Sequence, residues 1–239
     1  MRGHDSSNNS YDVLILGGGP AGAATAIALK RLDSSLRIAV VEKSDYSSTR
    51  IGETLPPPAQ AVLRGLGVWD AFIRTSPMIS YGTRAAWGTA DPYDNEFIFS
   101  LHGNGWHLDR NAFDAMLTTE AIKVGVDVHV KTAPCGPPRR HQNWTLPVRA
   151  GGMTYEVKAR FVVDATGRHS WFAHQMGVRH RVYDQLAAIF VFYQCEPGKT
   201  ALDSYTLIEA TQHGWWYSAM LPQRRMAVAF MTDVAYLRQ

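Results

Sequence analysis

The chain has 239 residues, a formal net charge of +3 and 46% hydrophobic residues. This composition supports a sizeable buried core, and the mild, scattered positive charge does not indicate a nucleic-acid surface. Cys135 and Cys195 show no pairing pattern, which favours a reducing compartment. The first apolar run is too short for a signal peptide or a membrane span, so we expect a cytoplasmic protein that does not associate with membranes. The polar residues 1–10 are expected to form a disordered tail.

The N-terminal third has the pattern of a strand, a tight turn, a helix and a second strand. The apolar run 13–16 enters a glycine-rich turn, an alanine-rich segment continues to about residue 32, and a second apolar run, 38–41, ends at Glu42. This order is typical of a dinucleotide-binding βαβ unit.

Three glycines of the turn have the G-x-G-x-x-G spacing. Gly17 permits a sharp exit from the strand, Gly19 lets a pyrophosphate approach the backbone, and Gly22 lets the helix pack closely on the strand. The helix N-terminus would then bind the phosphates, and Glu42 would accept hydrogen bonds from ribose hydroxyls. The pattern does not separate FAD from NAD(P), but an acid at position 42 makes NADP the least favoured ligand.

A proline-rich segment follows the second strand. It reads Arg50-Ile51-Gly52-Glu53-Thr54-Leu55-Pro56-Pro57-Pro58, and it leads into expected helices over 58–66 and 68–73. Arg50 is either a cation close to the pyrophosphate or a solvated loop arginine.

The middle of the chain alternates between strand and helix patterns. Residues 84–87 and 96–100 predict a hairpin inserted into the nucleotide domain. Asp109 is a plausible N-cap for a helix that Gly125 ends, and 126–130 predicts a third parallel strand. Residues 134–157 indicate a meander.

Residues 161–164 predict another buried strand, which ends in the small-residue turn 164–168. Asp164 then lies either at the binding edge of the sheet or simply in a turn. A short helix is expected over 170–176. Residues 186–195, 205–210, 214–222 and 226–232 predict a second, antiparallel sheet. Trp215, Trp216 and Tyr217 in that sheet are either core residues or the lining of a flat substrate's pocket.

These elements predict an α/β fold with a Rossmann-like parallel-sheet domain and an antiparallel-sheet substrate domain. The expected boundaries are 11–80 and 104–180 for the first, and 81–103 and 181–239 for the second. No histidine pair has metal-ligand spacing on one helical face, and neither a G-x-S-x-G elbow nor a P-loop lysine motif is present. We therefore expect no metal site and no hydrolase site.

Six motifs in this order resemble the FAD-dependent aromatic hydroxylase superfamily, in its tryptophan-halogenase-like branch, which includes flavoproteins of quinone-cofactor biogenesis. The motifs are DVLILGGGPAGAATAIAL, Glu42, RIGETLPP, LDR, DATGR and GWWYSAMLP. The resemblance covers nearly the whole chain and implies FAD as the cofactor. The implied FAD-binding residues are Gly17, Gly19, Ala21, Gly22, Glu42, Lys43, Arg50, Arg110, Asp164, Thr166 and Gly167.

The activity that the resemblance implies is monooxygenation of an electron-rich aromatic substrate, small or protein-borne, through a flavin C4a-hydroperoxide. NAD(P)H or a partner reductase would supply electrons, and no catalytic residue is identified. Alternatives are a flavin-dependent halogenase, a flavin reductase of isoprenoid double bonds, and a non-catalytic partner that only binds a substrate.

Three departures from the family pattern bear on these predictions. The family has a further FAD motif beyond the point that Gln239 reaches, so we expect the C-terminal part of the fold to be missing and a further segment or second chain to complete it. The halogenase motif W-x-W-x-I-P aligns with Tyr217 and Ala219, and alanine is expected to leave space there. No lysine occurs between Lys43 and Lys123, whereas the halogenases use one in this region. The changed tryptophan positions and the missing lysine favour hydroxylation over halogenation.

Overall fold

The computed structural model describes residues 9–89, 91–196 and 204–238, and its contacts divide the chain into two compact units. Unit 1 comprises residues 1–49 and 114–180, and unit 2 comprises 50–113 and 181–239. Most of the predicted N-terminal tail, 1–8, lies outside the described residues. The first strand already begins at Ser10, the last residue of that predicted tail.

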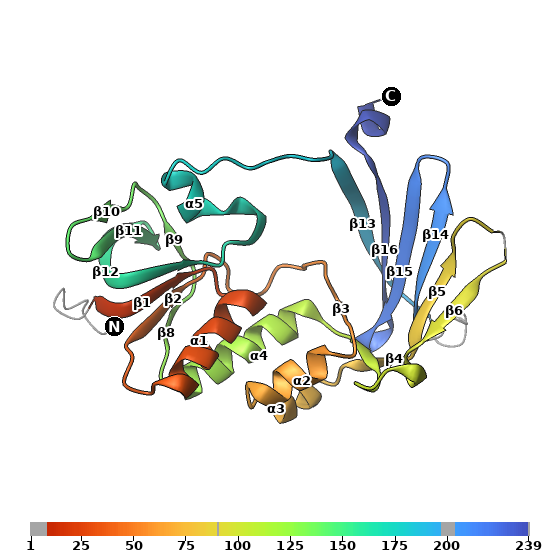
Figure 1. Cartoon of the computed structure of the whole chain (residues 1–239), viewed down its shortest axis with the longest axis horizontal. Helices are drawn as coiled ribbons and strands as arrows, with labels where there is room; N and C mark the ends of the chain where they lie inside the picture. The colour runs from red at the N-terminus through yellow and green to blue at the C-terminus, as the bar shows by residue number, and fades with distance from the viewer. Residues whose placement is uncertain (1–8, 90, 197–203, 239) are drawn as a thin grey trace. The chain divides into compact units, whose positions relative to one another are not determined.

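Unit 1 is built on a mixed sheet whose central strands are parallel. The strand order is β10-β11-β12-β1-β2-β8, and β9 pairs with β11. Strand β1 is parallel to β12 and β2, and β2 is parallel to β8, whereas β9, β10, β11 and β12 pair antiparallel (Figure 1). The strands are β1 (Ser10–Leu16), β2 (Ile38–Val41), β8 (Asp127–His129), β9 (Thr132–Pro134), β10 (Arg139–Arg140), β11 (Trp144–Ala150) and β12 (Met153–Asp164). The Rossmann-like fold is thus confirmed, with an antiparallel extension along one edge.

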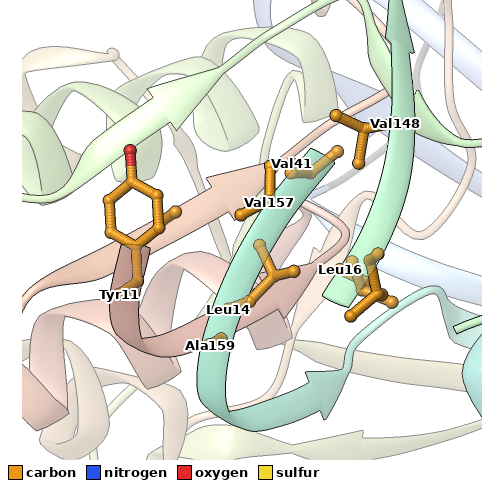
Figure 2. Close-up of a cluster of buried hydrophobic side chains, with 9 residues drawn as sticks. Tyr11, Leu14, Leu16, Val41, Val148, Val157 and Ala159 are labelled. Carbon is orange, nitrogen blue, oxygen red and sulfur yellow. The ribbon is translucent and has the colours of Figure 1, made fainter. Parts of the chain in front are cut away.

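The core of unit 1 lies on this sheet. Leu14, Leu16 and Val41 from the parallel strands pack with Val148 and Val157 from the antiparallel extension (Figure 2). These aliphatic side chains are at most 2% exposed. Their burial removes apolar area from water and fixes the register of the strands, because a slip of one residue would turn them to the other face.

Three helices flank these strands: α1 (Pro20–Leu32), α4 (Arg110–Lys123) and α5 (Trp171–Gln175). Helix α1 has Pro20 in its first turn and buries the small residues Ala23 and Ala26, which permits close packing on the sheet. The predicted N-cap of α4 is confirmed, because Asp109 Oδ1 accepts hydrogen bonds from the amides of Asn111 and Ala112.

Strand β12 differs from the buried strand predicted at 161–164. It begins at Met153, and Phe161 is 63% exposed although Val157 and Ala159 on the same face are buried. Pairing with β11 ends at Ala159, so beyond that residue β1 is the one strand that pairs with β12 among the described residues. The sequence motif at 161–164 is therefore the carboxyl end of a longer strand.

Unit 2 contains a six-stranded sheet and a three-stranded sheet. The larger sheet has the order β13-β16-β15-β14-β5-β6 and is antiparallel except where β14 pairs with β5 (Figure 1). Its strands are β5 (Gly82–Ala86), β6 (Tyr93–Glu96), β13 (Leu186–Gln194), β14 (Tyr205–Thr211), β15 (Gly214–Leu221) and β16 (Arg225–Asp233). The smaller sheet, in the order β3-β7-β4, comprises β3 (Thr54–Leu55), β7 (Gly105–His107) and β4 (Met78–Ser80).

The second strand of the predicted hairpin is Tyr93–Glu96, earlier in the chain than the 96–100 expected. Strand β6 ends at Glu96, and residues 97–99 form a 3-10 turn closed by a hydrogen bond from the Ser100 amide to the Phe97 carbonyl. The Phe97 amide donates to the Tyr81 carbonyl, which turns the chain out of the sheet. The prediction of a strand over 96–100 was therefore wrong.

The helices of unit 2 are α2 (Ala59–Gly65) and α3 (Trp69–Arg74). Phe72 of α3 is fully buried and contacts the rings of Trp69, Trp106 and Phe113 at centroid distances of 5.6 to 5.7 Å. Because of this packing and the β3-β7-β4 pairing, residues 50–80 and 104–113 group with unit 2. The sequence-based boundaries placed them in the nucleotide domain. Among the described residues, no helix is long and apolar enough to cross a membrane.

Candidate functional site

The turn after β1 is shaped by two glycines that accept no side chain. Gly17 has φ of +103°, and a Cβ there would overlap the carbonyl oxygen of Ala165. A Cβ on Gly22 would overlap the carbonyl oxygen of Gly17. Gly17 thus makes the sharp turn, and Gly22 allows α1 to approach the strand, as the spacing predicted.

Gly19 stands in open space. It is the N-cap residue of α1, and apart from its two chain neighbours no atom lies within 4 Å of the position that its Cβ would take. The first-turn amides of α1 have no partners inside the helix and carry a partial positive charge. A pyrophosphate group fits this arrangement, because the backbone is uncovered at Gly19 and Ala21 is exposed in the first helical turn.

Glu42 is held at the carboxyl end of β2. Its side chain is only 5% exposed, and Oε2 accepts a 2.7 Å hydrogen bond from the Gly18 amide. Oε1 accepts hydrogen bonds from the amide and the hydroxyl of Ser44, at 2.9 and 2.6 Å. The carboxylate is therefore fixed against the glycine turn, while the neighbouring Lys43 is exposed. Contact of Glu42 and Lys43 with FAD stays a prediction.

The turn 164–167 lies beside the glycine turn, because Leu16 pairs with Asp164 in the sheet. Asp164 Oδ1 accepts from the amide and hydroxyl of Thr166, and Oδ2 accepts from the amides of Phe172 and Ala173. Burial raises the pKa of Asp164, but these hydrogen bonds outweigh it and lower the pKa below its ordinary value. Asp164 thus joins the turn to the start of α5.

The predicted residues of unit 1 therefore meet at one edge of the sheet. Leu16 pairs with both Val41 and Asp164, so the ends of β1, β2 and β12 are adjacent. In parallel sheets, ligands bind at the carboxyl ends of the strands. The residues gathered there are Gly17, Gly19, Ala21, Gly22, Glu42, Lys43, Asp164, Thr166 and Gly167.

The two predicted arginines belong to unit 2. Arg110 Nη1 donates to the carbonyls of Ile51 and Gly52, at 2.6 and 3.3 Å. A Cβ on Gly52 would lie 2.6 Å from the same nitrogen, and Gly52 has φ of +94°. Arg110 therefore shapes the segment that follows Arg50, and contact of either arginine with FAD stays a prediction.

A polar cluster lies inside unit 2 around Tyr217. Its hydroxyl is 2.7 Å from the hydroxyl of Thr54. Burial and then the nearby Glu53 carboxylate raise the pKa of Tyr217 above its ordinary value, so the phenol stays protonated and able to donate a hydrogen bond. Glu53 itself is only 4% exposed.

Beside this cluster lies His107, which pairs with Thr54 in the three-stranded sheet. Its imidazole is fully buried, and Nε2 lies 3.1 Å from the hydroxyl of Thr206, the residue opposite Ala219. Burial lowers the pKa of His107 to about 4, and the backbone of Met220 opposes this shift. Ala219 pairs with Thr206 and Ala227 in the sheet and is only 2% exposed, so the expectation that alanine leaves space there was wrong.

The three aromatic residues predicted for a substrate pocket do not share one face. Successive side chains of a strand point to opposite faces, so Trp215 and Tyr217 lie on one side of β15 and Trp216 on the other. Trp216 packs on Phe230 with ring centroids 4.7 Å apart, and Trp215 packs on Trp87 at 6.0 Å. The three residues therefore cannot line one face of a pocket together. The ring that packs against Trp215 is Trp87.

The family described as "FAD binding domain" matches residues 10–235 of this sequence. The chain belongs to the FAD binding domain family. FAD is therefore its cofactor, and the chain is related to FAD-dependent oxidoreductases, as the sequence motifs predicted.

Known relatives of this FAD binding domain protein include oxidoreductases and halogenases. The chain is 29% identical over 235 residues to the FAD-dependent oxidoreductase LodB of Marinomonas mediterranea, covering 96% of this chain and 62% of LodB. It is 29% identical over 209 residues to a 1H-pyrrole-2-carbonyl-[peptidyl-carrier protein] chlorinase of Pseudomonas fluorescens, covering 76% and 45%. The solved structure of a myxobacterial chondrochloren halogenase superposes with a TM-score of 0.85 at 24% identity, covering 96% and 54%. The chain thus spans about half to two thirds of these proteins.

Sequence reasoning missed several residues at these sites. The structure adds Gly18, Tyr46, Thr118, Glu53, His107 and Trp87 to those predicted. Only two had a local signal, Gly18 as the middle glycine of the turn and Glu53 within RIGETLPP. Tyr46 and Trp87 lie in loops, Thr118 lies on helix α4 and His107 lies on β7, and each meets its partner only through the tertiary structure.

Proposed function

We propose that this FAD-dependent oxidoreductase hydroxylates an electron-rich aromatic substrate. The observation that carries the proposal is the meeting of the glycine turn, Glu42 and the Asp164 turn at one sheet edge in a chain of the FAD binding domain family. Bound FAD would supply electron transfer and oxygen activation, and the protein would supply orientation and exclusion of water.

Unit 1 would hold the cofactor. The uncovered backbone at Gly19 and the start of α1 would bind the pyrophosphate, and the fixed carboxylate of Glu42 would accept hydrogen bonds from the ribose. Asp164 would keep the adjoining turn in place through its four hydrogen bonds. In the reaction one oxygen atom of O₂ enters the product, the other leaves as water, and NAD(P)H or a partner reductase supplies two electrons.

Unit 2 would contact the aromatic substrate. Trp215 and Tyr217 lie on the same face of β15, and Trp87 contacts Trp215. Flat aromatic surfaces of this kind favour aromatic ligands through stacked and edge-to-face contacts. The phenol of Tyr217, kept protonated by burial and by Glu53, would accept a hydrogen bond from a polar group of the substrate on its hydroxyl oxygen.

Halogenation is the second candidate, and the relatives support it at least as well as hydroxylation. The chlorinase and the structurally similar halogenase share much of this chain's length. Against it stands the absence of lysine between Lys43 and Lys123, where arginine is a poor substitute because its guanidinium stays protonated. In halogenation, halide and O₂ would be consumed with two electrons and one aromatic C–H bond, giving the aryl halide and two waters.

The mass of the product distinguishes the two reactions. The protein would be incubated with FAD, NADH, a flavin reductase, O₂ and bromide, together with indole, pyrrole, phenol and a tryptophan-containing peptide. A product heavier by one oxygen atom supports hydroxylation, and a brominated product supports the second candidate. Flavin oxidation that yields only hydrogen peroxide with every probe would contradict both. Heat-denatured protein with the same reductase controls for free oxidants in solution.

A further inference from the structure

The middle glycine of the turn is held by side chains on both of its backbone groups. The Gly18 amide donates to Glu42 Oε2 at 2.7 Å, and the Gly18 carbonyl accepts a 2.9 Å hydrogen bond from the Tyr46 hydroxyl. A Cβ on Gly18 would overlap that hydroxyl and lie 2.9 Å from the Cβ of Glu42. Position 18 therefore requires a glycine, because the side chains of Tyr46 and Glu42 leave no room for a Cβ.

Tyr46 is itself fixed from a third element. Its hydroxyl accepts a 2.7 Å hydrogen bond from the hydroxyl of Thr118 on α4, and its side chain is 7% exposed. A tyrosine hydroxyl has one hydrogen to donate, and Thr118 directs that hydrogen toward Gly18 by occupying the acceptor side. A continuous chain of hydrogen bonds therefore runs from Thr118 through Tyr46 and Gly18 to Glu42.

The backbone of Tyr46 is in an unfavourable conformation. Its φ is +64°, in the left-handed region that a bulky side chain rarely adopts. Such a conformation persists only where surrounding contacts over-determine it, and these outliers cluster at functional sites. In this conformation the Tyr46 hydroxyl reaches the Gly18 carbonyl.

We propose that Tyr46 is a positioning residue for FAD, which holds the Gly18 carbonyl inward so that the turn is preformed for the pyrophosphate. A carbonyl turned outward would present its negative end to the phosphates. Because the amide and the carbonyl of Gly18 are both hydrogen-bonded within the protein, the backbone at Gly19 and the start of α1 would be the groups that bind the pyrophosphate. The inference rests on FAD binding alone, so it does not depend on which group the enzyme transfers.

The test compares matched variants of the whole chain in FAD titrations followed by flavin fluorescence. Tyr46→Phe removes only the hydroxyl and should weaken FAD binding about fivefold to tenfold, the loss expected for one neutral hydrogen bond. Thr118→Val should weaken it about twofold to threefold, and Thr118→Ser, which keeps the hydroxyl, should bind as the wild type does. Tyr155→Phe is the control, because it removes the hydroxyl of a tyrosine that contacts His129 of β8.

Amide hydrogen exchange without FAD gives a second readout, which separates this role from general stability. Tyr46→Phe should exchange faster in the peptide that covers residues 16–22 and at the wild-type rate in β2 and β8. Faster exchange throughout unit 1, or affinity and turn exchange within twofold of the wild type, would overturn the proposal. If neither the wild type nor any variant binds FAD measurably, the exchange data alone decide whether Tyr46 positions the turn. The absence of binding would then count against the cofactor assignment.

Discussion

His107 of β7 and Thr206 of β14 join the two sheets of unit 2 through a 3.1 Å contact between the imidazole Nε2 and the threonine hydroxyl. Both side chains are buried, and the imidazole has no exposure to solvent. Burial disfavours the charged form of an imidazole, so protonation of His107 would destabilise the fold.

We expect unit 2 to lose stability as the pH falls from 6.5 toward 4. Burial lowers the pKa of His107 from 6.5 to about 4, so in this range the unfolded chain binds a proton that the folded chain does not. The free energy of unfolding therefore falls with decreasing pH, by about 3 kcal/mol when the effect is complete. Between pH 7.5 and 5 the melting temperature should drop by about 4 to 8 °C from this group alone.

Thermal unfolding of two histidine variants checks this pH dependence. His107→Gln should have a smaller loss of melting temperature between pH 7.5 and 5 than the wild type. His102→Gln, which alters an exposed histidine of the same unit, should keep the wild-type loss. Equal pH slopes for the wild type and His107→Gln would contradict the prediction.

Glu42→Gln should weaken the glycine turn even without cofactor. Both carboxylate oxygens accept hydrogen bonds, one from Gly18 and the other from Ser44. A glutamine places an NH₂ group against one of these donors whichever way the amide is turned, which costs about 1 to 3 kcal/mol. Urea unfolding should show this loss, and Glu209→Gln on the exposed part of β14 is the control. A midpoint equal to that of the wild type would mean that these contacts do not stabilise the turn.

Two glycine substitutions in the same turn should separate cofactor binding from folding. Gly19→Val places a side chain where, apart from the two chain neighbours, no protein atom lies within 4 Å of the Cβ, so FAD binding should fall at least about 100-fold while the melting temperature stays within about 2 °C. Gly18→Ala meets Tyr46 and Glu42 and should lower both quantities. Normal FAD affinity in Gly19→Val would refute the assignment of the pyrophosphate to this turn.

Asp164→Asn should detach α5 from the end of β12. Asp164 receives two donors on each oxygen, so the asparagine NH₂ faces backbone amides in either orientation. We expect a loss of about 1 to 3 kcal/mol in the free energy of unfolding. Asp33→Asn is the matched control, because Asp33 also accepts an amide and a hydroxyl but lies in an exposed turn, where the cost should be below about 0.5 kcal/mol. Similar costs at the two positions would show that Asp164 has no special structural role.

The sequence by itself determined much of the cofactor-binding part of unit 1. The spacing of Gly17, Gly19 and Gly22, followed by Glu42, indicated a strand, turn, helix and strand, and these elements are present as β1, α1 and β2. This worked because the requirements are local. A sharp turn and a close helix approach each need a glycine at a fixed distance along the chain.

Only the tertiary structure decided which side chains hold the glycine turn and how the aromatic residues of β15 are distributed over the two faces of the sheet. Tyr46 and Thr118 are 72 residues apart, and His107 and Thr206 are 99 residues apart, so no local pattern connects them. Trp215, Trp216 and Tyr217 looked like one cluster in the sequence, but the two faces of β15 separate them. The sequence suggested open space at Ala219, but in the sheet this residue is only 2% exposed. Hydrogen bonds and packing between distant segments depend on how the strands pair, and that pairing is set by the fold as a whole.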